Sequence, residues 1–417
     1  MENRQVVITG FKILSSVGWD TEDNTDVLYS RSSLKLGEIT RYNIQDTSLR
    51  YGAQIPDKID NSWDRKLKKY ASIKDVGALS TIKQAWEESG AAGVYDGKRS
   101  SLYTGMGSNQ VGDLSGYFVN VLHCLDDDFR FNSSKFGATL LDSVNPMIVM
   151  EAILNNTLCY GSKYLEFRGR NSNFMDWEAA SFGAIHDGFY SIVEGRSDVA
   201  VVGGTCATLD PFNVMEDYHA GYYLVKDSIE DLCKNVKPYG KNVSGSIPVE
   251  GSCYFVLEER SQAEKRGANI LGRICGIKSF CGKEALTHAI KSLKEERVFD
   301  EKDLCFVAGS GCGTPLDNLE LEAVNSSLTE PTLMFSPRSS FYNMIEASTA
   351  LATVSSLVAF REGITPPTLN YNDKIDIERR VILSSKSQDI DTNKSKALIP
   401  CVSRNGIAGA LVLERIK

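Results

Sequence analysis

Histidine is scarce in this chain, and its cysteines are scattered. Among 417 residues there are only four histidines, and no two of the ten cysteines form a CxxC pair. A zinc site needs closely spaced cysteine and histidine ligands, so the sequence predicts no metal site. Scattered cysteines are typical of reduced, buried thiols, and we expect neither a metal nor another cofactor.

Three further features are missing. The net charge of −8 at pH 7 gives no basic surface for nucleic acid. No apolar run approaches the about 20 residues that span a bilayer, which argues against a membrane protein. The first ten residues lack the apolar segment and cleavage site of a signal peptide. We therefore expect a cytoplasmic globular protein that binds neither nucleic acid nor membranes.

Short apolar runs alternate with longer amphipathic stretches along the chain. Residues 6–8 and 199–202 are continuous apolar runs, as in strands that are buried on both faces of a sheet. Residues 73–88 and 182–194 have apolar side chains at helical spacing. Alternation of strand and helix predicts an α/β fold with crossover connections.

The pattern starts again after Glu258. The apolar run 304–308 leads into a glycine in the same way as residues 199–204, and a helix at 354–361 is stopped by Gly363 and the prolines that follow. No linker of Pro, Gly or Ser separates the two parts. We predict two intimately packed halves, residues 1–258 and 259–417.

Several segments resemble, in order, those of the β-ketoacyl-acyl-carrier-protein synthase family. They are Val6–Gly10, Val144–Met147, Asp198–Gly204, Val256–Glu259 and Gly363–Asn370. Each segment alone is a weak signal, but together they extend over nearly the whole chain. The resemblance implies an α/β thiolase fold, in which two similar halves stack as five alternating helix and sheet layers, and it implies a dimer.

The chemistry of that family is missing from this chain. Its members use a cysteine thiolate at a helix N-terminus, activated by the helix dipole, to carry the acyl chain. Counting back from Gly204, the nucleophile position falls on Glu178, and a longer loop after Tyr160 leaves Asn173 as an alternative. With either register there is no cysteine between Cys159 and Cys206.

Both family histidines, which assist decarboxylation and stabilise the oxyanion, are also absent. The motifs place Ser310 at the first histidine, Asn343 at the second and Arg338 at the family lysine. The last histidine of the chain is His288, so no other register restores them. The late glycine- and phenylalanine-rich loop of the family is replaced by residues 403–409.

The resemblance implies a chain-length factor of a type II polyketide synthase. Such a subunit pairs with an active ketosynthase as a heterodimer, and the polyketide is carried by an acyl carrier protein on phosphopantetheine. A second hypothesis is a decarboxylase of malonyl groups on the carrier protein, using Glu178, Ser310 or Asn343. A third is a scaffold whose tunnel is filled. Glu178 could equally be a first-turn carboxylate that stabilises the helix dipole, and Arg338 a structural ion-pair partner.

The resemblance also suggests which side chains set chain length. In the family the polyketide tunnel crosses the dimer interface, and the matching segment here is residues 111–122. Leu114, Tyr117 and Val121 fall on one helical face, and Phe118 borders it. We expect these four residues to gate the tunnel, although such a stripe is also typical of an ordinary core.

Overall fold

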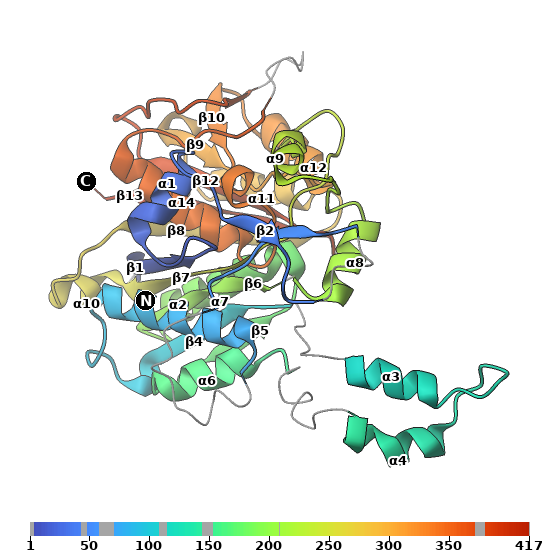
Figure 1. Ribbon diagram of the computed structural model, residues 1–417. Coiled ribbons are helices and arrows are strands. Elements are labelled where there is room, and N and C mark those ends of the chain that lie inside the picture. Colours follow the sequence, from blue (N-terminus) through green and yellow to red (C-terminus); the bar gives the residue numbers. More distant parts are fainter. Residues whose placement is uncertain are drawn as a thin grey trace.

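A mixed β-sheet organises the molecule. The computed structural model describes residues 4–42, 48–57, 71–107, 115–143, 153–207, 209–371 and 380–416. In these ranges one 11-stranded sheet forms (Figure 1). Its strands, in spatial order, are β11 (Val381–Leu383), β10 (Thr332–Phe335), β9 (Leu304–Ala308), β12 (Lys396–Val402), β13 (Ile407–Arg415), β8 (Gly272–Cys281), β1 (Val6–Leu14), β7 (Glu250–Glu259), β6 (Val199–Ala207), β4 (Ser100–Gly105) and β5 (Asn171–Phe174).

The sheet consists of two halves with the same topology. From the centre outward the first half runs β1, β7, β6, β4, β5, and the second runs β8, β13, β12, β9, β10. In each half the two innermost pairings are antiparallel and the next two are parallel. The halves join where β1 pairs with β8 over three residues. This repeat confirms the two similar halves that the sequence predicts.

Helices cover both halves and separate them. The helices that pack on the strands are α2 (Ile73–Ser89), α6 (Asn156–Tyr164), α7 (Ala180–Val193), α11 (Ala285–Glu295), α12 (Leu316–Ser327) and α14 (Ser348–Glu362). Helices α2 and α6 contact the first half, α11 and α12 contact the second, and α7 and α14 contact each other between them (Figure 1). The resulting five alternating layers confirm the predicted thiolase fold.

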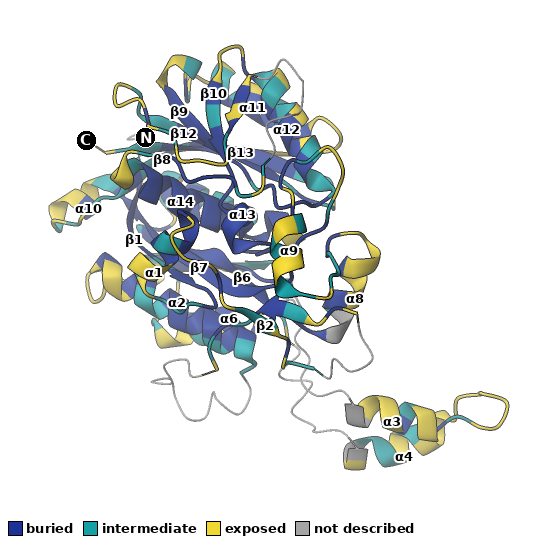
Figure 2. Cartoon of the chain, turned by 45° about the horizontal axis from the view of Figure 1, so that its top comes forward, coloured by how far each residue is buried: buried dark blue, intermediate teal, exposed yellow. Residues whose placement is uncertain are grey.

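The remaining elements lie around this sandwich. They are α1 (Thr21–Leu28), α3 (Ser115–His123), α4 (Ser133–Ser143), α8 (Pro211–His219), α9 (Ile229–Asn235), α10 (Arg260–Lys265), α13 (Arg338–Phe341) and the two-stranded sheet of β2 (Leu36–Glu38) and β3 (Tyr51–Ala53). Figure 2 shows α3 and α4 standing clear of the sandwich as an exposed helical hairpin. In the described part of the chain no helix is long and apolar enough to cross a membrane.

Helix α14 is buried on almost every side, as its position between the two halves requires. Its residues from Ser348 to Ala359 are all buried (Figure 2). The hydroxyls of Thr353 and Ser356 donate to carbonyls one turn earlier, both at 2.8 Å, and so are satisfied inside the core. Gly363 ends the helix in the left-handed conformation, with φ of 73°, as the sequence predicts.

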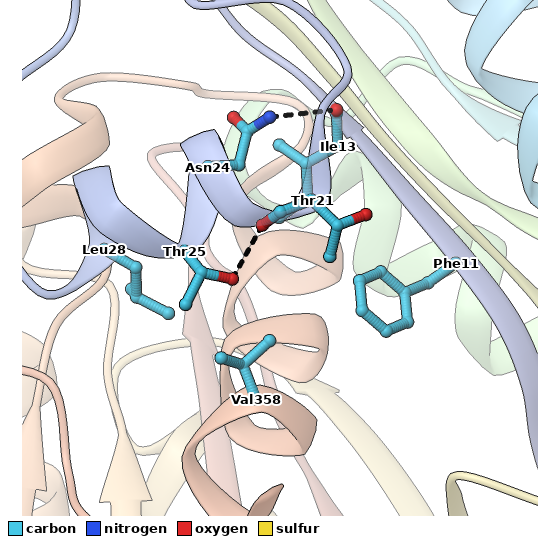
Figure 3. Close-up of a pocket in the computed structure, with 7 residues that line it drawn as sticks. All are labelled: Phe11, Ile13, Thr21, Asn24, Thr25, Leu28 and Val358. Carbon is cyan, nitrogen blue, oxygen red and sulfur yellow. Dashed lines mark hydrogen bonds between the residues drawn. The ribbon is translucent and has the colours of Figure 1, made fainter. Parts of the chain in front are cut away.

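Helix α1 closes the sandwich beside α14. Figure 3 shows Thr25 and Leu28 of α1 on the side of the helix that faces Val358 of α14, with Phe11 of β1 nearby. The hydroxyl of Thr25 donates to the carbonyl of Thr21 at 2.7 Å. The cavity between these residues has a volume of about 10 Å³, which is room for at most one water molecule. This seam is packed core and too small to bind a substrate.

Two glycines allow strands β4 and β6 to pack closely against the start of α7 and the segment before α14. A Cβ added at Gly105, the last residue of β4, would lie 2.5 Å from the carbonyl carbon of Ala180. A Cβ added at Gly204 in β6 would lie 2.2 Å from the carbonyl oxygen of Glu346. Any side chain at either position would push apart the segments that form the candidate site.

Candidate active site

Glu178 lies in a tight turn that leads into α7. The turn Trp177–Ala179 directly precedes the helix, and Glu178 is only 2% exposed. Trp177 has a φ of 47°, which is rare for a residue with a side chain and costs about 1–3 kcal/mol. The nucleophile position assigned from the sequence is therefore a strained, buried turn at a helix start. Asn173 instead lies in β5, where its side chain bonds Thr104 and the carbonyl of Met106.

The carboxylate of Glu178 is held by the loop between β12 and β13. The guanidinium of Arg404 donates to Oε1 from Nε at 3.1 Å and from Nη2 at 2.7 Å. The backbone N–H of Arg404 and the hydroxyl of Ser403 both donate to Oε2 at 3.2 Å. Both carboxylate oxygens therefore have partners from a segment 226 residues away.

Arg404 bonds a second buried carboxylate. Its Nη1 donates to Oδ1 of Asp217 in α8, and its guanidinium lies 3.8 Å from the ring centroid of Tyr222. Burial alone would lower the pKa of Arg404, but Glu178 and Asp217 raise it above its ordinary value. Burial raises the pKa of Asp217, and Arg404 only partly opposes that shift. The guanidinium thus stays charged between two buried carboxyl groups.

Ser310 lies on a loop that is pinned by the helix after it. The carboxylate of Glu320 in α12 accepts from the Ser310 hydroxyl at 2.7 Å and from the hydroxyl of Tyr239 at 2.5 Å. Asp317, one turn earlier, accepts from the backbone of Gly313 at 2.8 Å. Neither carboxylate was predicted as a site residue from the sequence, although their spacing near the start of a helix could have indicated them.

Arg338, the first residue of α13, meets Asn343, just beyond the end of that helix, in the core. The Nη2 of Arg338 donates to Oδ1 of Asn343, and its Nη1 donates to the hydroxyl of Ser348 at 3.3 Å. Tyr342, just before Asn343, has φ of 53° and ψ of −148°, which is again strained for a residue with a side chain. The positions that the sequence assigns to the nucleophile and to the second histidine both follow a strained residue.

The two strained turns are adjacent in space. The backbone N–H of Ser181 at the start of α7 donates to the carbonyl of Glu346 at 3.0 Å. The hydroxyl of Ser181 accepts from the backbone of Ala350 at 3.3 Å. The structure thus brings the Glu178 turn next to the Asn343 segment, as a shared active site would require.

Two thiols lie beside the site. Cys312 belongs to the motif from which Ser310 was assigned, whereas Cys401 was not predicted to lie here. The Sγ of Cys401 donates to the carbonyl of Glu178 at 3.6 Å, and the Sγ of Cys312 donates to Oδ1 of Asn343 at 3.7 Å. Burial raises the pKa of each thiol to about 12. A raised pKa disfavours the thiolate form that a nucleophile needs. In the described residues no group of His, Cys, Asp and Glu could hold a metal ion.

The four expected tunnel residues belong to the segment of α3. Leu114 lies outside the described residues. Tyr117 and Phe118 are 36% and 44% exposed, and Val121 lies on the same helix. The ring of Tyr117 lies 5.6 Å from that of Phe136 in α4, so the two helices pack together. Their role as a tunnel gate stays a prediction.

Comparison with known proteins places this geometry in a family. The model of the β-ketoacyl synthase N-terminal domain matches residues 3–263, and that of the C-terminal domain matches residues 278–372. A 3-oxoacyl-[acyl-carrier-protein] synthase 2 of Coxiella burnetii is 24% identical, with all of both chains covered. The corresponding protein of Synechocystis sp. is also 24% identical, with 89% of each chain covered.

Solved structures have the same fold. The ishigamide ketosynthase/chain length factor superposes with a TM-score of 0.80 at 18% identity, covering all of both chains. A type II polyketide synthase acyl-carrier protein in complex with its ketosynthase bound to the hexaketide gives a TM-score of 0.79 at 16% identity, again over all of both chains. Both family domains match in order, and together they extend over most of the sequence. The chain therefore belongs to the β-ketoacyl synthase family.

Proposed function

We propose that this protein is a chain-length factor, a non-catalytic subunit that pairs with an active ketosynthase and limits how long its polyketide grows. The observation that carries the proposal is that the carboxylate of Glu178 is hydrogen-bonded in the protein interior. The head of α7 holds a carboxylate bonded to Arg404, Ser403 and the loop backbone where the family chemistry needs a thiolate. The positions of the two histidines hold Ser310 and Asn343, which cannot supply an imidazole.

Two exposed features support a protein partner. Strand β5 is the outer strand of the described sheet, with only β4 beside it, so its backbone can pair with another chain. The hairpin of α3 and α4 exposes a group of large apolar side chains, which is unusual for a surface in contact with water. They are Tyr117, Phe118, Val119, Leu122, Phe129 and Phe131. We infer that the catalytic ketosynthase covers both features in a heterodimer.

The named complexes among the structural neighbours agree with such an assembly. One is a ketosynthase/chain length factor, and another contains an acyl-carrier protein with its ketosynthase. In the proposed assembly the acyl carrier protein delivers the polyketide on phosphopantetheine to the catalytic subunit. This chain then forms the far end of the tunnel that shields the reactive carbonyls from water.

Reconstitution tests the proposal. The purified chain, incubated alone with malonyl-loaded carrier protein, is expected to form no acyl-enzyme and to release no carbon dioxide above background. Combined with a cysteine-containing ketosynthase from the same gene neighbourhood, it should yield a polyketide of defined length. Decarboxylation by the isolated chain would instead support the priming decarboxylase. A stable complex that makes no product would support a scaffold.

The tunnel residues provide a second test in the same reconstituted pair. Tyr117→Ala and Phe118→Ala are each expected to lengthen the product by one or more malonyl units, because a smaller side chain moves the end wall outward. Phe280→Ala is the matched control, since Phe280 is a similarly exposed aromatic residue, 42% exposed in β8 and outside the hairpin. Unchanged product length in both test variants, measured by mass spectrometry, would remove these residues from the gate.

A further inference from the structure

The side chain of Arg404 covers position 178. It reaches across from the β12–β13 loop and bonds Oε1 of Glu178 through two nitrogens. One face of its guanidinium lies on Tyr222 at 3.8 Å, and the indole of Trp177 lies 5.8 Å away. Under this cover Glu178 is 2% exposed, whereas Trp177 beside it is 39% exposed. The cover is therefore local to position 178.

The covering side chain is fastened at both ends. Asp217 in α8 binds Nη1, while the backbone N–H of Arg404 also donates to Glu178. Next to it, the hydroxyl of Ser403 donates to the carbonyl of Asp176 at 2.9 Å, and the amide of Asn405 donates to its carboxylate at 3.2 Å. The loop is thus bonded to the turn on both sides of Arg404. If the Arg404 side chain moved away, the buried carboxylates of Glu178 and Asp217 would lose the positive charge beside them. That loss would raise the free energy of the folded chain.

We propose that Arg404 is a charge-fastened plug that closes position 178 to the pantetheine-bound acyl groups of carrier proteins. Glu178 and Asp217 hold the plug in place, so Glu178 is a fastening residue rather than a weakened catalyst. It follows that this subunit meets a polyketide only from the side of its partner. This last consequence rests on the proposed function, but closure of position 178 does not.

Chemical labelling of the whole purified chain tests the plug directly. A thiol is introduced by Glu178→Cys, which leaves Arg404 its contacts with Asp217 and Tyr222. The thiol is treated with iodoacetamide, and its rate of alkylation is followed by peptide mass spectrometry. The same rate is measured in Glu178→Cys/Arg404→Ala and, as a matched control, in Glu178→Cys/Arg361→Ala. Arg361 is an exposed arginine paired with its neighbour Glu362. The exposed Cys281 serves as an internal reference in every sample.

The direction of the change decides between two roles of Arg404. If Arg404 is a plug, its removal raises the alkylation rate at position 178 at least about tenfold. The reason is that a covered thiol reacts only in the fraction of molecules whose loop has opened, whereas an uncovered thiol reacts in all of them. If Arg404 acts only through its charge, its removal lowers the rate, because a nearby cation favours the reactive thiolate. An unchanged or lower rate overturns the proposal. The Arg361→Ala control should match Glu178→Cys alone.

Partial unfolding is distinguished within the same experiment. Cys253 is fully buried in β7, so its alkylation reports a general loss of structure. If the Arg404→Ala variant labels Cys253, the decision passes to Glu178→Cys/Asp217→Asn, which keeps the arginine but lacks both carboxylates that hold it. That variant should alkylate faster at position 178 with Cys253 still protected, and no acceleration there overturns the plug. Product length is not measured, so failure here leaves the chain-length proposal standing.

Discussion

At the scale of single residues, the site is defined by buried charge. Arg404 stands between Glu178 and Asp217, which are 2% and 5% exposed. Removing charges from water costs about as much as their attraction returns, so such a group adds little net stability. Deleting one member is different, because it leaves the other charges buried without compensation. The network thus adds little to the free energy of unfolding, and its main effect is to hold these side chains in one arrangement.

The first prediction follows from that asymmetry. Arg404→Ala should lower the free energy of unfolding by about 3–5 kcal/mol, because two buried carboxylates lose their cation. Arg361→Ala removes an exposed pair with Glu362 and should change it by less than about 1 kcal/mol. Urea denaturation followed by circular dichroism measures both. Equal effects of the two substitutions would contradict the assigned role of Arg404.

At the scale of elements, buried or half-buried carboxylates join helices to strands of the second half. Glu320 and Asp317 of α12 hold the loop of Ser310, as described above. Glu301, in the turn before β9, has a similar role further out. It accepts from Lys294 of α11 and from the backbone and hydroxyl of Thr329 at 2.8 and 2.9 Å. One side chain therefore ties α11 and the end of α12 to β9.

Glu301 provides a pH prediction. Burial alone would raise its pKa, but the bonds from Lys294 and Thr329 lower it from the ordinary 4.5 to about 2. A depressed pKa in the folded state means that this stabilisation is complete above pH 4.5 and is lost as the pH falls towards 2. Glu301→Gln should therefore lower the unfolding midpoint near neutral pH, and the difference from wild type should shrink below pH 4.5. Glu295→Gln, which alters an exposed pair with Lys291, is the control.

Thermal unfolding at a series of pH values checks this expectation. A gap between wild type and Glu301→Gln that stays constant from pH 7 to pH 2.5 would show that Glu301 does not titrate in this window.

The boundary between the halves, predicted after residue 258, lies within β7, which ends at Glu259. Its exact place stays a prediction.

At the scale of the whole molecule, the exposed hairpin is the feature that a single chain leaves unexplained. Its apolar side chains gather on α3 and in the loop before α4, away from the core. Apolar surface of this kind is stabilised when a partner removes it from water. The hairpin therefore fits the proposed heterodimer better than it fits a monomer.

Substitutions on this surface should separate assembly from folding. Val119→Ser with Leu122→Ser changes side chains that are 49% and 64% exposed, so the isolated chain should keep its unfolding midpoint. Co-purification with the co-expressed ketosynthase should fall at least about tenfold, because the interface loses apolar contact. Val94→Ser with Val243→Ser changes equally exposed residues elsewhere and should leave co-purification intact. Undiminished co-purification of the hairpin variant would place the interface elsewhere.

The sequence by itself determined the fold class and the missing chemistry. Continuous apolar runs that end in glycine at 199–204 and 304–309 encode buried strands, and the structure has β6 and β9 there. Helical spacing at 73–88 and 182–194 matches α2 and α7 to within two residues at each end. These elements could be predicted because the spacing of apolar side chains in a strand or helix depends only on residues that are close together in the sequence. The absence of histidine after His288 needed only the sequence.

Tertiary structure alone decided what surrounds the position that the sequence assigns to the nucleophile. Arg404 lies 226 residues from Glu178, and Cys401 lies 223 residues from it, so no local pattern links them. Their contact depends on how α7 and the β12–β13 loop pack at one end of the sandwich. The same holds for Glu320 with Tyr239 and for the exposed hairpin, since burial is a property of the packed molecule. The sequence shows which groups are present, whereas packing decides which charged groups contact each other and which apolar side chains remain exposed.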